Sequence, residues 1–302
     1  MSAVIAELAP TLPGRDRRLA VPPSTAPLPL EFPSARQRMG YLLTNPWKNL
    51  LLPAGWLRRL VSGSRSPLIA ESRVNPGGWR SMEIIYRNAS PVDWFDRQAL
   101  RDNPISMAAR NRRRIVTRTI SRLMVYYGAD SNVIVVGVGA GPGRHVQAAI
   151  GESGLSPERV TAYLIDRDQD AFEYGRRLAA RLGISRRVHF LHGDARRIDE
   201  VLPDVTPHIV KLVGLAEYLS DDELLDLLRA LHRAMIAGGS LVTHGLIDRH
   251  GTGRFLERVF NLRHRQRTAA QMSALLTNAG FRIAECVLEP AGVYPIITAV
   301  RG

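Results

Sequence analysis

The chain has 302 residues, of which 45% are hydrophobic, so it is long enough to bury one large core. Its net charge of +13 is carried almost entirely by arginine, with lysine only at positions 48 and 211. No stretch approaches the ~20 apolar residues of a membrane span, and no basic segment precedes an apolar core at the N-terminus. A single cysteine, Cys286, excludes an internal disulfide and a cysteine metal cluster. We therefore expect a cytoplasmic protein without membrane partner or bound metal, with Cys286 in its core.

The first 128 residues show two patterns. Residues 1–34 are rich in Pro and Ala, which favours a disordered tail. Residues 35–128 read as a helical region, with two short amphipathic helices broken by Pro46 and Pro53. This region ends in one long helix that Asn103 could cap, with Pro104 at its first position and Gly128 at its end. Its aromatic residues would pack as a core cluster or cover a site, and they are Trp79, Tyr86, Trp94 and Phe95.

From Ser131 onward, strand and helix patterns alternate, which predicts a mostly parallel α/β sheet. The last two strands are separated by only five residues, too few for a crossover helix, so they must form an antiparallel hairpin. The sequence thus predicts seven strands, six parallel and one antiparallel. The expected strands are 132–136, 160–165, 188–192, 208–213, 240–246, 281–288 and 294–300. The expected helices are 144–150, 169–182, 221–235 and 269–279.

The most informative motif is SNVIVVGVGAGPG at 131–143. A buried strand enters a loop with glycines at 137, 139, 141 and 143, and a helix begins directly behind it. Glycines at such a junction bring bare backbone close to a ligand at a helix N-terminus. The loop therefore predicts a site for a nucleotide-like cofactor.

Two acidic residues follow the next two strands. Asp166 stands at the tip of the second strand, where a carboxylate can accept both hydroxyls of a ribose, although it could instead cap the following helix. Asp194 follows the third strand in HGDA, where an Asx-turn is the structural alternative.

These motifs, with the terminal hairpin and the block from Val213 to His244, resemble the class I S-adenosylmethionine-dependent methyltransferases over residues 131–302. The resemblance implies a Rossmann-like sheet in which Gly137, Gly139, Gly141 and Gly143 cradle the cofactor. It implies that Asp166 holds the ribose and Asp194 the adenine amino group. It also places Arg167, Ala195 and Gly214 at the cofactor.

Two positions depart from the family pattern. Val135 occupies the position where members commonly carry an acid, so the cofactor's amine needs another acceptor, such as a backbone carbonyl or a group from the N-terminal part. Lys211 falls in the middle of a central strand, where an unpaired charge is costly. It is either functional or reaches past the strand to a polar surface.

Methyl transfer requires alignment of nucleophile, methyl and sulfur, exclusion of water, and a base where the nucleophile carries a proton. The catalytic candidates are Glu217 and Tyr218, after the fourth strand, and His244 near the end of the fifth, as base or substrate contact. Tyr86 is the candidate substrate contact in the helical region. We expect that region, 35–128, to act as a lid, and the insertion 251–267 to form part of the substrate wall.

The leading expectation is a small-molecule methyltransferase. Arginines at 110–118 and 254–267 leave an RNA methyltransferase open. A nicotianamine-synthase-like aminocarboxypropyl transferase would use the same cofactor, and a non-enzymatic scaffold is a further alternative. The helical region could also serve as the arm of a homodimer.

Overall fold

The computed structural model describes residues 27–302, so most of the predicted tail lies outside the described residues. A seven-stranded sheet with the order β3-β2-β1-β4-β5-β7-β6 forms the centre of the molecule. β7 pairs antiparallel with β5 and β6, and every other pairing is parallel. The predicted fold class is therefore confirmed. The strands are β1 (Val133–Val138), β2 (Val160–Asp166), β3 (Val188–His192), β4 (Ile209–Leu212), β5 (Ser240–His244), β6 (Phe281–Leu288) and β7 (Pro295–Arg301).

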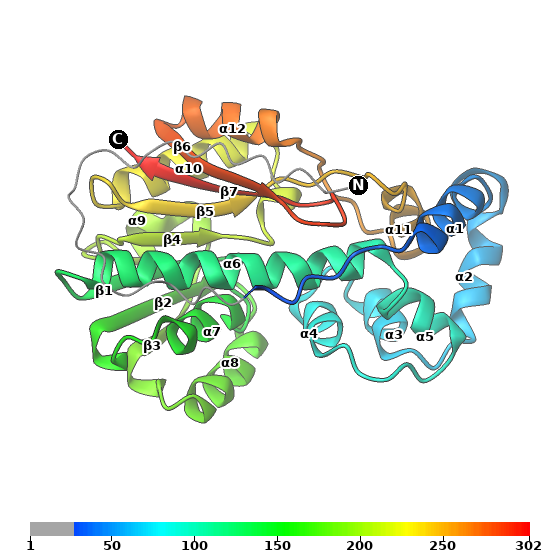
Figure 1. Cartoon of the computed structure of the whole chain (residues 1–302), viewed down its shortest axis with the longest axis horizontal. Helices are drawn as coiled ribbons and strands as arrows, with labels where there is room; N and C mark the ends of the chain where they lie inside the picture. Colours follow the sequence, from blue (N-terminus) through cyan, green and yellow to red (C-terminus); the bar gives the residue numbers. More distant parts are fainter. Residues whose placement is uncertain (1–26) are drawn as a thin grey trace.

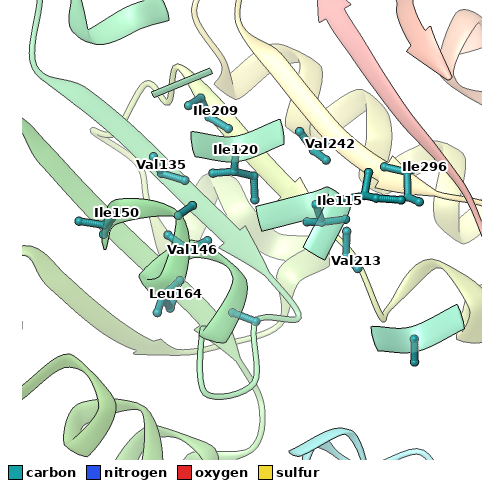
Figure 2. Close-up of a cluster of buried hydrophobic side chains, with 14 of the residues drawn as sticks. Ile115, Ile120, Val135, Val146, Ile150, Leu164, Ile209, Val213, Val242 and Ile296 are labelled. Carbon is teal, nitrogen blue, oxygen red and sulfur yellow. The ribbon is translucent and has the colours of Figure 1, made fainter. Parts of the chain in front are cut away.

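Helices cover both faces of the sheet (Figure 1). One face is covered by α6 (Pro104–Gly128), α7 (Arg144–Ser153) and α8 (Gln169–Arg181). The other is covered by α9 (Ile198–Val201), α10 (Asp221–Ala234) and α12 (Ala269–Asn278). Figure 2 shows the core of the first face, where side chains of α6 and α7 meet those of the central strands. The layers are packed so that the N-terminal half of α6 reaches the carboxyl ends of β4 and β5.

The N-terminal helices gather at the end of the molecule toward which the parallel strands point (Figure 1). They are α1 (Ala35–Pro46), η1 (Trp47–Leu51), α2 (Ala54–Ser62), α3 (Pro67–Val74), α4 (Trp79–Arg87) and α5 (Trp94–Leu100). Pro53 precedes α2 as predicted, but Pro46 does not break the first helix. The chain continues through η1 as a π-helical turn, closed by the Leu52 N–H donating to the Trp47 carbonyl at 2.9 Å.

The long helix α6 begins as predicted, because the Asn103 side chain accepts the Ile105 N–H at 2.9 Å and Pro104 takes the first position. It runs along the sheet and supplies Ile115 and Ile120 to its core. α6 is thus a layer of the sheet body, which differs from the expected boundary between a lid and a catalytic domain at residue 128.

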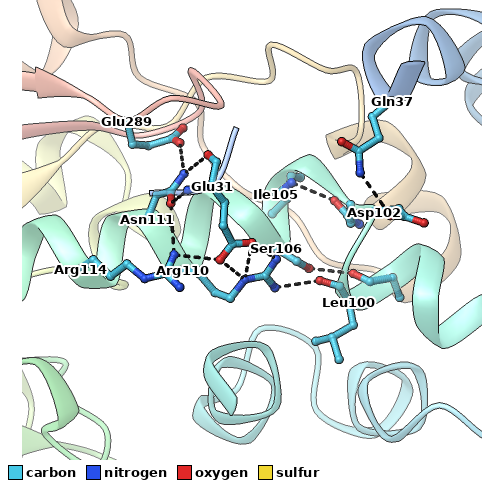
Figure 3. Close-up of polar contacts among 12 residues, drawn as sticks. Glu31, Gln37, Leu100, Asp102, Ile105, Ser106, Arg110, Asn111, Arg114 and Glu289 are labelled. Carbon is cyan, nitrogen blue, oxygen red and sulfur yellow. Dashed lines mark hydrogen bonds and ion pairs between the residues drawn. The ribbon is translucent and has the colours of Figure 1, made fainter. Parts of the chain in front are cut away.

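The end of the predicted tail is held against α6. Glu31 accepts hydrogen bonds from Arg110 at 2.8 Å and from Arg114 at 2.8 Å, and its backbone exchanges two bonds with Asn111 (Figure 3). Leu28 packs against the main core. Residues 27–34 therefore belong to the folded body, because one carboxylate there neutralises two arginines of α6.

A further correction concerns Cys286, which is exposed rather than in the core. It lies on β6, the outermost strand of the sheet, whose side chains are mostly exposed. An apolar run on an edge strand does not imply burial on both faces.

Candidate active site

The glycine loop lies where β1 ends and α7 begins. Gly139, Gly141 and Gly143 all adopt positive φ angles, of 55°, 54° and 73°, which residues with a side chain rarely adopt. A Cβ on Gly139 would come within 3.0 Å of the Leu215 side chain in the loop after β4. The backbone here thus requires glycine for its conformation and for the close approach of a neighbouring loop.

Asp166 ends β2 and holds this loop directly. One carboxylate oxygen accepts the Gly141 N–H at 2.6 Å, and the other accepts the Asp168 N–H at 2.9 Å. The helix-capping alternative does not apply, because Asp168 is the residue that caps α8. Each Asp166 oxygen retains a lone pair, so the carboxylate is positioned by the fold and can still accept bonds from a ligand.

Asp194 stands beyond β3 in a more crowded setting. It forms ion pairs with Arg167 and with Arg196, the latter at 2.8 Å, and it accepts the Arg196 N–H as an Asx-turn. Hydrogen bonds from Arg196 lead the causes that hold its pKa far below the usual value. The structural alternative considered for Asp194 is therefore realised, and a ligand here would have to share the carboxylate with two arginines. Ala195 follows as the buried first residue of a 3-10 turn.

A buried polar cluster lies across from the glycine loop, where α6 crosses the carboxyl ends of β4 and β5. It consists of Arg112, Glu217, His244 and Tyr294, hereafter the Arg112 cluster. Arg112 Nη1 lies 3.0 Å from His244 Nε2 and 3.6 Å from Glu217 Oε1, and its guanidinium lies 4.3 Å from the Tyr294 ring centre. Burial opposes the charge of Arg112, but Tyr294, Tyr86 and Glu217 raise its pKa. The guanidinium therefore stays charged and holds the cluster together.

His244 occupies a fixed, neutral state. Its Nδ1–H donates to the Gly245 carbonyl at 2.7 Å, so Nε2 is the acceptor for Arg112 and for the Gly214 N–H at 3.2 Å. Burial lowers the His244 pKa to about 4, although Glu217 opposes this. The imidazole lone pair is thus already used, which suits His244 to positioning Arg112 and Gly214 rather than to accepting a substrate proton.

Glu217 carries the free acceptor of the cluster. It lies on the short turn Ala216–Tyr218 after β4 and is only 7% exposed. Burial favours its neutral form, but the pKa of the carboxyl is lowered overall, with the positive charge of Arg112 among the causes. Within residues 27–302, its Oε2 finds no hydrogen-bond partner and lies 3.6 Å from the neutral His244 ring at Nε2. An ionised, buried oxygen without a partner is costly unless a ligand donates to it.

Tyr218 stands at the outer side of this turn. Its hydroxyl lies 3.2 Å from His264 Nε2 and against Gly77 of the N-terminal region. Burial and the Glu217 charge raise its pKa, so the phenol remains protonated. His264 also lines a cavity of about 630 Å³, bounded by the end of β5, Ile105 of α6 and α11 (Gly253–Phe260). The predicted insertion 251–267 thus forms a wall of this cavity.

Lys211 links the glycine loop to the Arg112 cluster. It is 2% exposed on β4, and its Nζ donates to the Gly139 carbonyl at 3.3 Å. Burial lowers the Lys211 pKa to about 8, against the opposing influence of Asp166. The lysine does not escape to the surface; it fixes the glycine loop from within the sheet.

Helix α4 covers the glycine loop from the N-terminal side. A Cβ on Gly141 would approach the Trp79 Cβ at 3.3 Å, and Glu83 pairs with Arg144 at the start of α7. Tyr86 meets the His145 ring edge-on, with ring centres 5.9 Å apart. Trp79 Nε1 and His145 Nε2 are buried without a hydrogen-bond partner in the described part of the chain. Two unsatisfied polar atoms, one on α4 and one on α7, therefore lie where these two helices meet.

Sequence reasoning missed Arg112 and Tyr294. The arginines at 110–118 suggested a nucleic-acid surface, yet Arg112 is 3% exposed. Its position was readable from helical spacing, because Ala108, Arg112 and Val116 fall four residues apart on the stripe that faces the core. A lone cation within an apolar stripe indicates a buried partner.

No helix among residues 27–302 is long and apolar enough to cross a membrane. In the same residues, no group of three or more His, Cys, Asp or Glu side chains is arranged to hold a metal ion.

Comparison with known proteins places this geometry in context. The sequence model of a family described as "Putative methyltransferase" matches residues 95–301, which is more than half of the chain and includes α6. A search among curated protein sequences found no match.

Two solved structures are similar in fold. A protein of Bordetella parapertussis described as a possible exported protein shares 19% identity and a TM-score of 0.66, over 88% of this chain and 96% of its own. The magnesium protoporphyrin IX methyltransferase of Synechocystis, solved with bound S-adenosylhomocysteine, shares 15% identity and a TM-score of 0.56, over 78% of this chain and 98% of its own. The arrangement of strands and helices is thus one that known methyltransferases use.

Proposed function

The chain belongs to this methyltransferase family, and on that premise we propose that it transfers a methyl group from S-adenosylmethionine to a small-molecule acceptor. One observation carries the proposal: a glycine loop held by Asp166 contacts Leu215, two residues before Glu217, a buried carboxylate with an oxygen that has no hydrogen-bond partner among residues 27–302. The first feature suits a cofactor with a ribose, and the second suits an acceptor that brings a donor hydrogen.

The residues present fit the cofactor. The loop glycines leave backbone open to the methionine part, and Asp166 retains lone pairs for ribose hydroxyls. Trp79 Nε1 is a buried donor that has no hydrogen-bond partner in the described part of the chain, and it can bond the cofactor's carboxylate. Asp194 would accept the adenine amine in competition with Arg167 and Arg196.

The bound cofactor supplies an activated methyl group on a positively charged sulfur. Glu217 accepts the hydrogen of the acceptor's nucleophilic atom and so orients it for in-line attack. Arg112 keeps Glu217 ionised, and His244 fixes Arg112 through its only acceptor nitrogen. Tyr218, as a neutral phenol, donates to the acceptor or to His264 at the mouth of the site.

A small acceptor is supported by the covered site. α4 lies over the glycine loop, and the cavity beside His264 has a volume of about 630 Å³, in the range of small-molecule sites. The name of the Synechocystis relative also describes a small-molecule methyltransferase.

The RNA alternative loses part of its support. Among the arginines at 110–118, Arg110 and Arg114 pair with Glu31, and Arg112 lies inside the Arg112 cluster. These side chains are committed to internal partners and do not form a surface for phosphates.

The proposal is tested by incubating the protein with S-adenosylmethionine labelled on its methyl group and with two acceptor fractions, the low-molecular-weight fraction of a cell extract and total RNA. We expect label in the low-molecular-weight fraction and S-adenosylhomocysteine as the co-product, both absent with Gly139→Val. Label confined to RNA would contradict a small acceptor. Methylthioadenosine as the co-product would instead establish aminocarboxypropyl transfer.

The role of Glu217 has its own test. Glu217→Gln removes the charge but keeps the shape, so we expect turnover to fall by on the order of 100-fold while S-adenosylhomocysteine binds with nearly unchanged affinity. A large loss of that affinity would assign Glu217 to the cofactor's amine, the group for which Val135 offers no acceptor.

A further inference from the structure

The outermost helices carry the largest concentration of exposed apolar side chains. Half of the exposed large apolar side chains among residues 27–302 lie between positions 39 and 60. Six of these form a surface that we call the apolar tip, each between 50% and 68% exposed. The apolar tip consists of Leu42, Leu43, Trp47, Leu50, Leu51 and Trp56.

The apolar tip follows helical spacing and does not arise from irregular packing. Leu43, Trp47 and Leu50 recur every three or four residues along α1 and η1, so they share one side of a continuous helix. On α2 the buried side, Leu57 and Val61, packs against α11, which leaves Trp56 on the outer side. Both helices thus pack one face against the rest of the protein and expose the other to solvent.

The same segment is strongly cationic. Residues 32–70 contain six Lys or Arg and no Asp or Glu, so they supply nearly half of the net charge of +13. Arg38 and Arg58 donate to the carbonyls of Pro33 and Arg258, which satisfies hydrogen bonds without neutralising the charge. The apolar tip is therefore flanked by positive charge that no acid of the same segment neutralises.

We propose that the apolar tip docks the protein on the surface of an anionic phospholipid bilayer. Leucines on one side of a helix, tryptophans and flanking cations are the combination that binds at the headgroup boundary without spanning it. α1 and α2 stand at one extreme of the long axis, so they can enter the interface while the sheet stays outside it (Figure 1).

The charge distinguishes this partner from a second copy of the chain. Two copies joined through the apolar tip would bring together two segments that each carry six cations and no acid, and this repulsion disfavours self-association. Nucleic acid would match the charge but would leave the leucines without apolar contact. An anionic bilayer satisfies both features.

The experiment is sedimentation of the full chain with two kinds of vesicle, pure phosphatidylcholine and phosphatidylcholine containing about one third phosphatidylglycerol. We expect binding to the anionic vesicles, weakened by salt, and little binding to the neutral ones. The fluorescence of Trp47 and Trp56 should shift to shorter wavelength on binding, and Trp47→Phe with Trp56→Phe should remove most of that shift.

Two double variants separate the contributions. Leu43→Ser with Leu50→Ser should weaken binding by on the order of tenfold or more. Arg36→Glu with Arg59→Glu should weaken binding to anionic vesicles by at least about fivefold for each arginine. The matched controls are Leu182→Ser and Arg186→Glu, which alter exposed residues on the sheet body and should bind as the unchanged protein does. All six positions are exposed, so the folded state should be retained.

The proposal would be overturned by any of three results. The first is no binding to anionic vesicles. The second is equal binding by the tip variants and the controls. The third is a dimer in lipid-free solution that Leu43→Ser with Leu50→Ser dissociates, which would identify a second copy as the partner. Vesicle binding is measured without S-adenosylmethionine, so the outcome does not depend on the proposed methyl transfer.

Discussion

The glycine loop and the Arg112 cluster lie at the same carboxyl edge of the sheet, yet they are built in opposite ways. The loop comes from one continuous stretch of thirteen residues, 131–143, and works through bare backbone. The cluster comes from α6, the turn after β4, β5 and the residue before β7, and works through side chains. Lys211 on β4 donates a hydrogen bond to the Gly139 carbonyl of the loop. A continuous glycine loop can be predicted from the sequence because its residues are neighbours in the chain. A cluster of side chains from distant segments can be recognised only once the fold is known.

The largest effect on cofactor binding is expected from Gly139→Val, in the glycine loop. A branched side chain would meet Leu215 and force a residue with a Cβ to a φ of 55°, so we expect no measurable binding of S-adenosylmethionine or S-adenosylhomocysteine by calorimetry. The matched control is Gly154→Val, which has a φ of 68° but faces open space. It should lose about 1 kcal/mol of stability through strain and keep its affinity. Undiminished affinity in a folded Gly139→Val would contradict the site.

Substitutions in the Arg112 cluster should lower the stability of the fold, whereas Gly139→Val should abolish cofactor binding. Arg112→Ala leaves the buried Glu217 carboxylate without its cation, which should lower the free energy of unfolding by about 3–5 kcal/mol in denaturant titrations. Adding Glu217→Gln should recover part of the loss, because it removes the unpaired charge.

The control for Arg112 is Arg177→Ala, which removes an exposed ion pair with Glu173 of 2.6 Å. It should cost no more than about 0.5 kcal/mol. An Arg112→Ala loss as small as that would mean that the cluster does not hold this part of the fold together.

Asp166 holds the glycine loop, so its substitution should change the affinity for the cofactor. Asp166→Asn keeps an acceptor for one backbone N–H but loses the charge, so both cofactor forms should bind about 10- to 100-fold more weakly, or about 1.5–3 kcal/mol. Asp168→Asn, which alters only the cap of α8, should leave both affinities unchanged. A variant that loses turnover but binds S-adenosylhomocysteine normally would show that Asp166 does not hold the ribose.

Lys211 should make the stability of the protein depend on pH. Its folded pKa of about 8 lies below the ordinary 10.5, so between pH 8 and 10 the unfolded chain binds the proton that the folded protein has released. Stability should therefore rise with pH across this window, and Lys211→Met should reduce that slope by about 1 kcal/mol per pH unit. The control Arg282→Met, at an exposed position on β6, should leave the slope as it is. An unchanged slope in Lys211→Met would mean that the lysine stays charged in the fold.

The contrast between local patterns and contacts between distant segments explains which features could be predicted from the sequence. The strand and helix periodicities and the short final loop predicted the seven-stranded sheet and its antiparallel strand, because these patterns are local. The glycines and Asp166 were selected as candidate site residues on equally local patterns. Arg112 was misread as surface, since its burial depends on α6 lying against β4 and β5.

His244 illustrates the remaining limit. Its residue type favoured a base, but only the positions of Gly245, Gly214 and Arg112 reveal that both ring nitrogens are already engaged. Glu31 was assigned to a tail for a similar reason, because its partners lie about 80 residues away in the chain. Hydrogen-bond partners at such separation leave no pattern in a sequence.

The most direct test of the central claim is a crystal structure of the protein with S-adenosylhomocysteine. We expect the ligand to lie along Gly137–Gly143, with its ribose hydroxyls within hydrogen-bond distance of Asp166 and its sulfur on the side of Glu217. That result would join the glycine loop and the Arg112 cluster in a single site. A ligand bound away from the glycine loop, or with its sulfur pointing away from Glu217, would contradict the account.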